Sequence, residues 1–276
     1  PVCRCRDSSA THPAVEALSM RITGFKLGLL RIPLRTPFKT ALRTVEAIED
    51  VIIRLETDTG HAGYGEAPPT VAITGDSLES IMAALNGSIG PALMGSDIAD
   101  IDGNCRIVQN AMPNNTSAKA AAEIALYDLF AQSLKQPLYR VLGDGVGTPR
   151  LLTDLTISVN DTDSMIADCE SAIARGFPAL KIKVGKQPDG DIARLQAIRR
   201  AVGGRASLRI DANQGWSAGQ TISVMKALEA EGEIFELIEQ PVPAGDIEGM
   251  IAIKASIRTP LLADESAFNL AQVKQL

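Results

Sequence analysis

Apolar stretches recur along the chain, and their pattern changes near Leu151. From there on, each short apolar run is followed by a segment with the periodicity of an amphipathic helix. The five runs recur roughly every thirty residues; they are LTISV, ALKIKV, SLRIDAN, FELIEQP and PLLADES. Such strand–helix alternation predicts a parallel sheet, and this many units favour a barrel over the alternative, a doubly wound sheet.

The part of the chain before this change has a different order of elements. MRITGFKLGLL and EDVIIRLETDTGHAGYGEA predict strands, and the second stretch predicts a hairpin that turns near Thr59 and Gly60. A helical region follows to about residue 143, and its clearest helix is SAKAAAEIALYDLFAQSLK, with Ser117 as the expected N-cap. Strands followed by helices predict a separate α+β domain over residues 20–143.

Composition narrows the class of protein. The chain has 276 residues, 45% apolar and 22% charged, and its net charge of −6 without a basic run argues against nucleic-acid binding. No apolar stretch is long enough to span a membrane. Four cysteines without a CxxC pair indicate neither a zinc site nor a disulfide framework, so we expect a cytoplasmic location. Residues 1–19, which include Cys3 and Cys5, are expected to form a disordered leader.

Charged side chains stand where the expected barrel strands end. Lys181 and Lys183 lie two residues apart in ALKIKV, so both should project from the same face of a strand. Taken alone, the pair favours the solvated face of an edge strand, because exposed lysines protect sheet edges. The next three strands end in carboxylates, at Asp211, Glu239 and Asp264. In a parallel barrel the active groups project from these carboxyl ends, which predicts that the five side chains converge.

The converging groups indicate a metal site with a base beside it. Three carboxylates without a nearby histidine or cysteine offer only oxygen ligands, which suits Mg²⁺; the alternative is that each acid merely caps the following helix. Lysines near a cation and shielded from water should have a lowered pKa and could accept a proton. The implied reaction begins with removal of the proton next to a substrate carboxylate, giving an enediolate whose charge Mg²⁺ stabilises.

Several motifs carry a resemblance to a known family. KIKVG, DANQGW, IEQPV and LADES resemble, in order and spacing, the muconate-lactonising branch of the enolase superfamily. PFKTALRTVE, GYGEAPPTVAITGDS and AKAAAEIALYDL are most similar to the L-Ala-D/L-Glu (dipeptide) epimerases of that branch. The resemblance implies an α+β N-terminal capping domain and a (β/α)7β-type TIM barrel, of which residues 151–276 hold about five strand–helix units.

The implied activity is Mg²⁺-dependent epimerisation of dipeptides. A muconate cycloisomerase, an o-succinylbenzoate synthase-like enzyme and an inactive metal-binding fragment are the alternatives. By the resemblance, Lys183 is the base on one face of the substrate, and Lys181 neutralises the substrate carboxylate. Mg²⁺ would be held by the three strand-end carboxylates, Asp211, Glu239 and Asp264. Further substrate contacts are implied for Arg43, Thr156 and Asn213, with Arg43 reaching the glutamate side chain of the dipeptide.

One departure from the family pattern concerns the second catalytic lysine. In the family it lies on a strand after the third metal ligand, whereas this chain ends at Leu276, in the helix that follows LADES. We therefore expect the chain to be the front part of a longer protein, which would form a homo-oligomer when complete. The 276 residues alone are expected not to epimerise a substrate. The expected partner is a small carboxylate, with no role for nucleic acid or membrane.

Overall fold

The computed structural model of the chain describes residues 18–39, 44–143, 151–185, 188–232 and 235–276. The described residues divide into two units. One unit combines those of Pro1–Pro33 and Ala47–Pro149, and the other combines those of Leu34–Glu46 and Arg150–Leu276. The sequence pattern gives no sign that Leu34–Glu46 belongs with the second unit. A hydrogen bond from the Val159 amide to the Lys39 carbonyl, 3.2 Å long, ties this segment to it.

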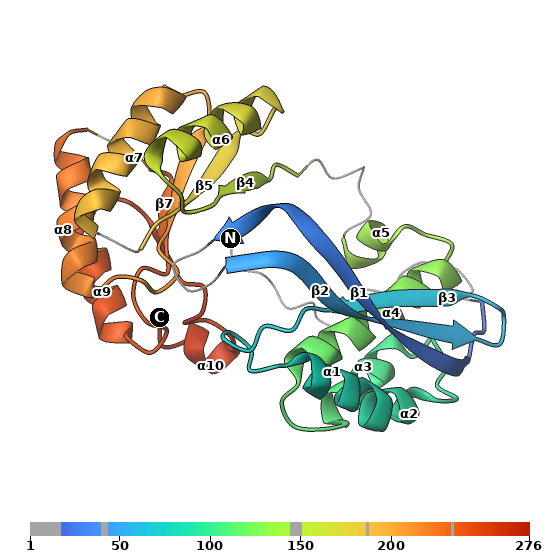
Figure 1. The fold of residues 1–276 in the computed structure, drawn as a ribbon. Coiled ribbons are helices and arrows are strands. Elements are labelled where there is room, and N and C mark those ends of the chain that lie inside the picture. The colour runs from blue at the N-terminus through green and yellow to red at the C-terminus, as the bar shows by residue number, and fades with distance from the viewer. Residues whose placement is uncertain (1–17, 40–43, 144–150, 186–187, 233–234) are drawn as a thin grey trace. The chain divides into compact units, whose positions relative to one another are not determined.

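The first unit contains a group of helices and most of a three-stranded sheet (Figure 1); the part of the sheet within Leu34–Glu46 belongs to the second unit. The strands are adjacent in chain order: β1 (Ile22–Lys39), β2 (Thr44–Thr57) and β3 (Ala62–Ala67). β2 and β3 pair antiparallel around a turn at which Gly60 has a φ of 80°, which confirms the expected hairpin. The helices are α1 (Leu78–Ala84), the π-helical turn η1 (Leu85–Ile89), α2 (Gly90–Leu93), α3 (Ile101–Asn110), α4 (Thr116–Ser133) and α5 (Leu138–Leu142).

Helix α4 does not begin as the sequence predicts. Ser117 is not its N-cap, because the helix starts one residue earlier, and Asn115 at the cap position is left-handed, with a φ of 52°, and makes no side-chain cap bond. The carboxylate of Asp76 instead accepts the Ser117 amide at 2.9 Å, from 41 positions earlier in the chain. This bond satisfies one of the amides that every helix start leaves unpaired. The prediction was wrong because local sequence does not reveal a cap supplied from so far away.

The small residues of β3 allow the strand to lie directly against α4. A Cβ added to Gly65 would stand 1.9 Å from the Ala121 carbonyl oxygen, so a side chain there would collide with the helix backbone. Behind this contact the core of the unit is fully buried, and its members include Ile53, Leu126 and Leu129. Close backbone approach and an alanine-rich helix thus let a small unit bury a continuous apolar core.

The second unit contains five parallel strands in unbroken chain order. They are β4 (Asp154–Ile157), β5 (Ala179–Lys183), β6 (Ser207–Asp211), β7 (Leu237–Glu239) and β8 (Leu261–Leu262). The helices that follow the strands are α6 (Thr162–Ala174), α7 (Pro188–Val202), α8 (Ala218–Ala230), α9 (Ile247–Ser256) and α10 (Leu270–Val273). A doubly wound sheet reverses its order at a switch point, and the described strands do not. This order confirms the expected part of an α/β barrel.

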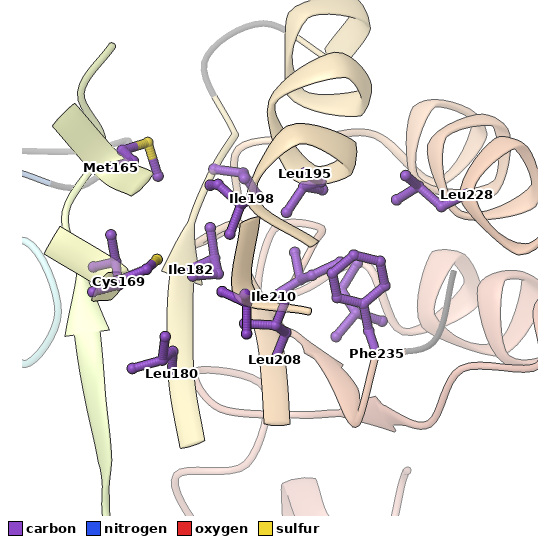
Figure 2. Packing of buried hydrophobic residues seen from close by; sticks show 14 of the residues in the cluster. Met165, Cys169, Leu180, Ile182, Leu195, Ile198, Leu208, Ile210, Leu228 and Phe235 are labelled. Carbon is purple, nitrogen blue, oxygen red and sulfur yellow. The ribbon is translucent and has the colours of Figure 1, made fainter. Parts of the chain in front are cut away.

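The barrel strands bury one face against the helices. Leu180 and Ile182 of β5 and Ile210 of β6 pack with Leu195 and Ile198 of α7 in one buried cluster (Figure 2). Fully burying one such side chain stabilises the fold by about 1.5–3 kcal/mol. Because successive strand residues point to opposite faces, the residues between these apolar ones project from the other face of the sheet. No described helix is both long and apolar enough to cross a membrane.

Candidate active site

The charged residues of the second unit meet at the carboxyl ends of adjoining strands. Lys183 at the end of β5 is opposite Asp211 at the end of β6, and Asp211 is in turn opposite Glu239 at the end of β7. Glu239 is opposite Leu262 at the end of β8, and Asp264 follows Leu262 by two residues. The strand register therefore brings one lysine and two carboxylates side by side at one edge of the sheet, with Asp264 just beyond it.

Lys183 is held by two oxygen acceptors in a buried position. Its ammonium group forms a short ion pair with Asp211 Oδ2 and donates a hydrogen bond to Asn213 Oδ1 at 2.7 Å. Lys183 is 6% exposed and Asp211 is 1% exposed, so water does little to screen the pair. The backbone amide of Asn213 donates to the other carboxylate oxygen, Asp211 Oδ1, at 2.9 Å. These contacts fix the position of the Lys183 nitrogen at the carboxyl-end edge of the sheet.

Lys181 bridges two of the carboxylates. Its ammonium group donates to both carboxylate oxygens of Glu239 at 3.1 Å and lies 3.6 Å from Asp211 Oδ2. Burial opposes the charge on Lys181, but the hydrogen bond and charge of Glu239, together with the charges of Asp211 and Asp154, outweigh burial and raise the pKa of Lys181. The lowering expected from the sequence concerns a lysine beside a bound cation, whereas here the carboxylates act on the amine directly.

The three acids crowd negative charge into a partly buried space. Burial, followed by the charge of Asp211, raises the pKa of Glu239; Lys181 offsets part of the rise, and Asp264 adds to it. Among the described residues, no three His, Cys, Asp or Glu side chains are grouped closely enough to hold a metal ion as they stand. The lysine ammonium groups take carboxylate oxygens of Asp211 and Glu239 instead.

The residues nevertheless fit Mg²⁺ by their chemistry. Asp211, Glu239 and Asp264 offer only carboxylate oxygens, the donors that Mg²⁺ prefers, and they stand at or just beyond adjoining strand ends. A cation bound here would compete with Lys181 for the oxygens of Glu239, because the same atoms serve both.

The remaining expected substrate contacts differ in how the structure places them. Thr156 of β4 is half-buried and lies directly opposite Lys181 in the strand register. Asn213 follows β6 with a left-handed φ of 44°, and its side-chain oxygen faces Lys183. The structure therefore brings both residues to the lysine pair. Arg43 lies outside the described residues.

Sequence reasoning missed several side chains that hold the loops after the strands. Asp191 of α7 is fully buried and accepts the amide of Gly185, two residues after Lys183, at 3.0 Å. Glu265 is also buried, and its burial raises the pKa of its carboxyl group. Gln214 and Gln240 join the loops that follow β6 and β7. The sequence could have singled out the two glutamines, though not their hydrogen bonds, since each lies in a motif beside an expected ligand or contact.

Comparisons with known proteins show which proteins the chain is similar to. Residues 27–143 match the mandelate racemase / muconate lactonizing enzyme N-terminal domain family, and residues 164–276 match the enolase C-terminal domain-like family. The L-Ala-D/L-Glu epimerase of Bacillus subtilis (strain 168) is 45% identical over 254 residues, which are 92% of this chain and 69% of the relative. A solved structure of the Bacillus subtilis epimerase in complex with substrate gives a TM-score of 0.87 and covers 91% of this chain and 70% of that one.

Two further solved structures are similar. A dipeptide epimerase from Enterococcus faecalis V583, complexed with Mg and L-Leu-L-Tyr, is 34% identical with a TM-score of 0.86, and the match covers 91% of this chain and 70% of that one. A muconate lactonizing enzyme from Pseudomonas fluorescens, complexed with muconolactone, is 31% identical with a TM-score of 0.84, covering 92% and 71%. Both domain families and these similarities lead to one conclusion: the chain belongs to the mandelate racemase / muconate lactonizing enzyme family of the enolase superfamily.

Proposed function

We propose that this site removes the proton α to a carboxylate in the Mg²⁺-dependent epimerisation of dipeptides of the L-Ala-D/L-Glu type. The observation that carries the proposal is the buried Lys183 ammonium group, fixed by Asp211 and Asn213 at the carboxyl end of a parallel strand. Such strand ends form the active face of α/β barrels. The names of the Bacillus subtilis and Enterococcus faecalis relatives support a dipeptide as the substrate.

Lys183 is assigned the transfer of the proton. In its neutral form the Nζ lone pair takes the α-proton, the C–H electron pair moves into the adjoining carboxylate, and an enediolate results. Return of a proton from the opposite face of the α-carbon gives the epimer, whereas return from Lys183 restores the starting isomer. Asp211 and Asn213 hold Nζ in position, so no search over rotamers is needed before the transfer.

Asp211, Glu239 and Asp264 are assigned to Mg²⁺, which when bound supplies positive charge at the substrate carboxylate. Lys181 then has a second role. Because its present partners are the oxygens of Glu239, binding of the ion would release its ammonium group toward the substrate carboxylate. Lys181 would thus exchange one carboxylate for another, and remain charged in both states.

Arg43, Thr156 and Asn213 are assigned to substrate contact. The position of Thr156 beside Lys181, and that of Asn213 beside Lys183, supports the assignment for these two residues. The assignment of Arg43 rests on its motif, KTALRTVE, and on the suitability of a guanidinium group for a bidentate bond to a glutamate carboxylate. Replacement of Arg43 by alanine should therefore reduce turnover of glutamate-ended dipeptides more than turnover of apolar-ended ones.

A cycloisomerase of the muconate type is the second candidate, favoured by the similarity to the Pseudomonas fluorescens structure. The two candidates separate in one assay. The chain is joined to the C-terminal segment of the Bacillus subtilis epimerase that lies beyond the matched region, and L-Ala-L-Glu, L-Leu-L-Tyr and muconate are offered with Mg²⁺. Epimerised L-Ala-D-Glu is the expected product, and it should vanish in the Lys183→Ala version of the same fusion. Turnover of muconate with no epimerisation of either dipeptide would reject the proposal.

A further inference from the structure

We propose that Gln240 is a positioning residue, whose side-chain amide sets the spacing between the ligands Glu239 and Asp264. The inference rests on the proposed metal-dependent function. Gln240 directly follows Glu239 at the end of β7 and is fully buried. It therefore does not contact solvent, and its role has to be found in what its amide binds inside the protein.

All four hydrogen-bonding positions of the Gln240 amide are used. Its oxygen accepts the backbone amides of Asp264 at 2.9 Å and Ser266 at 3.2 Å. Its nitrogen donates to the Val242 carbonyl at 2.9 Å and to the Ser266 hydroxyl at 2.8 Å. A side-chain amide offers two acceptor and two donor positions, so the group is saturated and has one orientation only.

The backbone of Gln240 reinforces the same connection. Its amide donates to the Leu262 carbonyl at 2.9 Å, and its carbonyl accepts the Gln214 amide at 2.8 Å. Its φ of 32° lies in the left-handed region, which residues other than glycine adopt seldom and at a cost of about 1–3 kcal/mol. Such a conformation persists where surrounding contacts fix it, and the loops after β6 and β8 supply those contacts here.

Asp264 needs this support more than the other two proposed ligands. Asp211 and Glu239 each end a strand and are held by the sheet ladder. Asp264 is exposed and lies beyond β8, which is only two residues long, so it is outside the sheet ladder. Its backbone amide donates instead to the side-chain oxygen of Gln240. The residue next to one ligand thus binds the backbone of another. Loss of the amide would leave Asp264 free to move away from Glu239 and would weaken ion binding.

The test measures binding of Mn²⁺, which substitutes for Mg²⁺ and has an EPR signal that disappears when the free ion binds. The wild-type chain is compared with Gln240→Met, which keeps the volume but removes all four hydrogen bonds. Gln196→Met is the matched control, because Gln196 of α7 makes its bond to Glu231, on the helix side of the unit. We expect the dissociation constant to rise about tenfold or more in Gln240→Met and to stay unchanged in the control.

A second variant covers the case in which Gln240→Met does not fold. Ser266→Ala removes one amide partner, and should raise the dissociation constant about threefold while far-UV circular dichroism stays native. When both variants fold, the double variant should bind no more weakly than Gln240→Met, because the Ser266 hydroxyl is expected to act on the ligands through its bond to the Gln240 nitrogen. Native variants with wild-type affinity, or additive losses, would overturn the inference. Absence of Mn²⁺ binding by the wild-type chain would instead overturn the proposed metal site.

Discussion

Removal of either member of the buried Lys183–Asp211 pair should lower the free energy of unfolding, but by unequal amounts. Among the described residues, Asp211 is the one carboxylate that pairs with Lys183. Asp211→Asn therefore leaves a buried ammonium group without an anion, and the expected loss in the free energy of unfolding is about 3 kcal/mol or more. Lys183→Met leaves Asp211 with Lys181 at 3.6 Å and with the Asn213 amide at 2.9 Å. Because these partners still compensate the carboxylate, the expected loss is about 1–2 kcal/mol.

The variant that combines Lys183→Met with Asp211→Asn tests directly whether the two losses in free energy of unfolding are coupled. Once Lys183 is methionine, the charge of Asp211 has one partner fewer, so Asp211→Asn should then destabilise the protein by about 2 kcal/mol less than it does alone. Urea unfolding at pH 7 with EDTA gives the three free energies. Trp216, the one tryptophan of the sequence, is 2% exposed and belongs to the second unit, so its fluorescence follows the unit that holds the pair. A greater loss in Lys183→Met than in Asp211→Asn, or additive losses, would refute the reasoning.

Two further predictions concern stability outside the site. Gly65→Ala should lower the free energy of unfolding by about 1–3 kcal/mol or more in urea titrations, since the new Cβ would stand 1.9 Å from the Ala121 carbonyl oxygen; Gly87→Ala, with open space around it, should cost nothing. Burial opposes the charge of Glu229, but hydrogen bonds from Thr259 and Arg258 together outweigh it and hold the pKa of Glu229 below its usual value. A lowered folded pKa means that the charged form stabilises the protein above the unfolded-state pKa. The free energy of unfolding should therefore be greater for wild type than for Glu229→Gln at neutral pH, and this difference should disappear as the pH falls through the folded pKa. An advantage that grows toward acid would contradict the assignment.

The sequence was sufficient to predict those features of the fold that follow from a regular repeat along the chain. Alternation along a strand places Lys181 and Lys183 on one face, and repeated strand–helix units place Asp211 and Glu239 at the same edge of a parallel sheet. Neither inference needs knowledge of which side chains finally touch. The hairpin turn near Gly60 was predictable for a different reason, because turn chemistry depends on neighbouring residues only.

Features that depend on contacts across the chain were out of reach. Asp76 caps a helix 41 positions later, and no local pattern connects it to Ser117. The direction of the Lys181 pKa shift depends on the balance between burial and the charge of Glu239, which requires distances. Gln240 lies inside a recognised motif, but its four amide bonds appear only when the loops after β7 and β8 are folded together.

The most direct test of the central claim follows the α-proton itself. The 276-residue chain is incubated with Mg²⁺ in D₂O, separately with L-Ala-L-Glu and L-Ala-D-Glu, and ¹H NMR records the glutamate α-proton and any epimer. Lys183 serves one face of the α-carbon, so one isomer should slowly lose its α-proton signal without inversion, and Lys183→Ala should abolish the loss. Exchange that survives in Lys183→Ala, or no exchange with either isomer, would contradict Lys183 as the base. Epimer formed by the chain and abolished in that variant would show that another of its residues supplies the second proton.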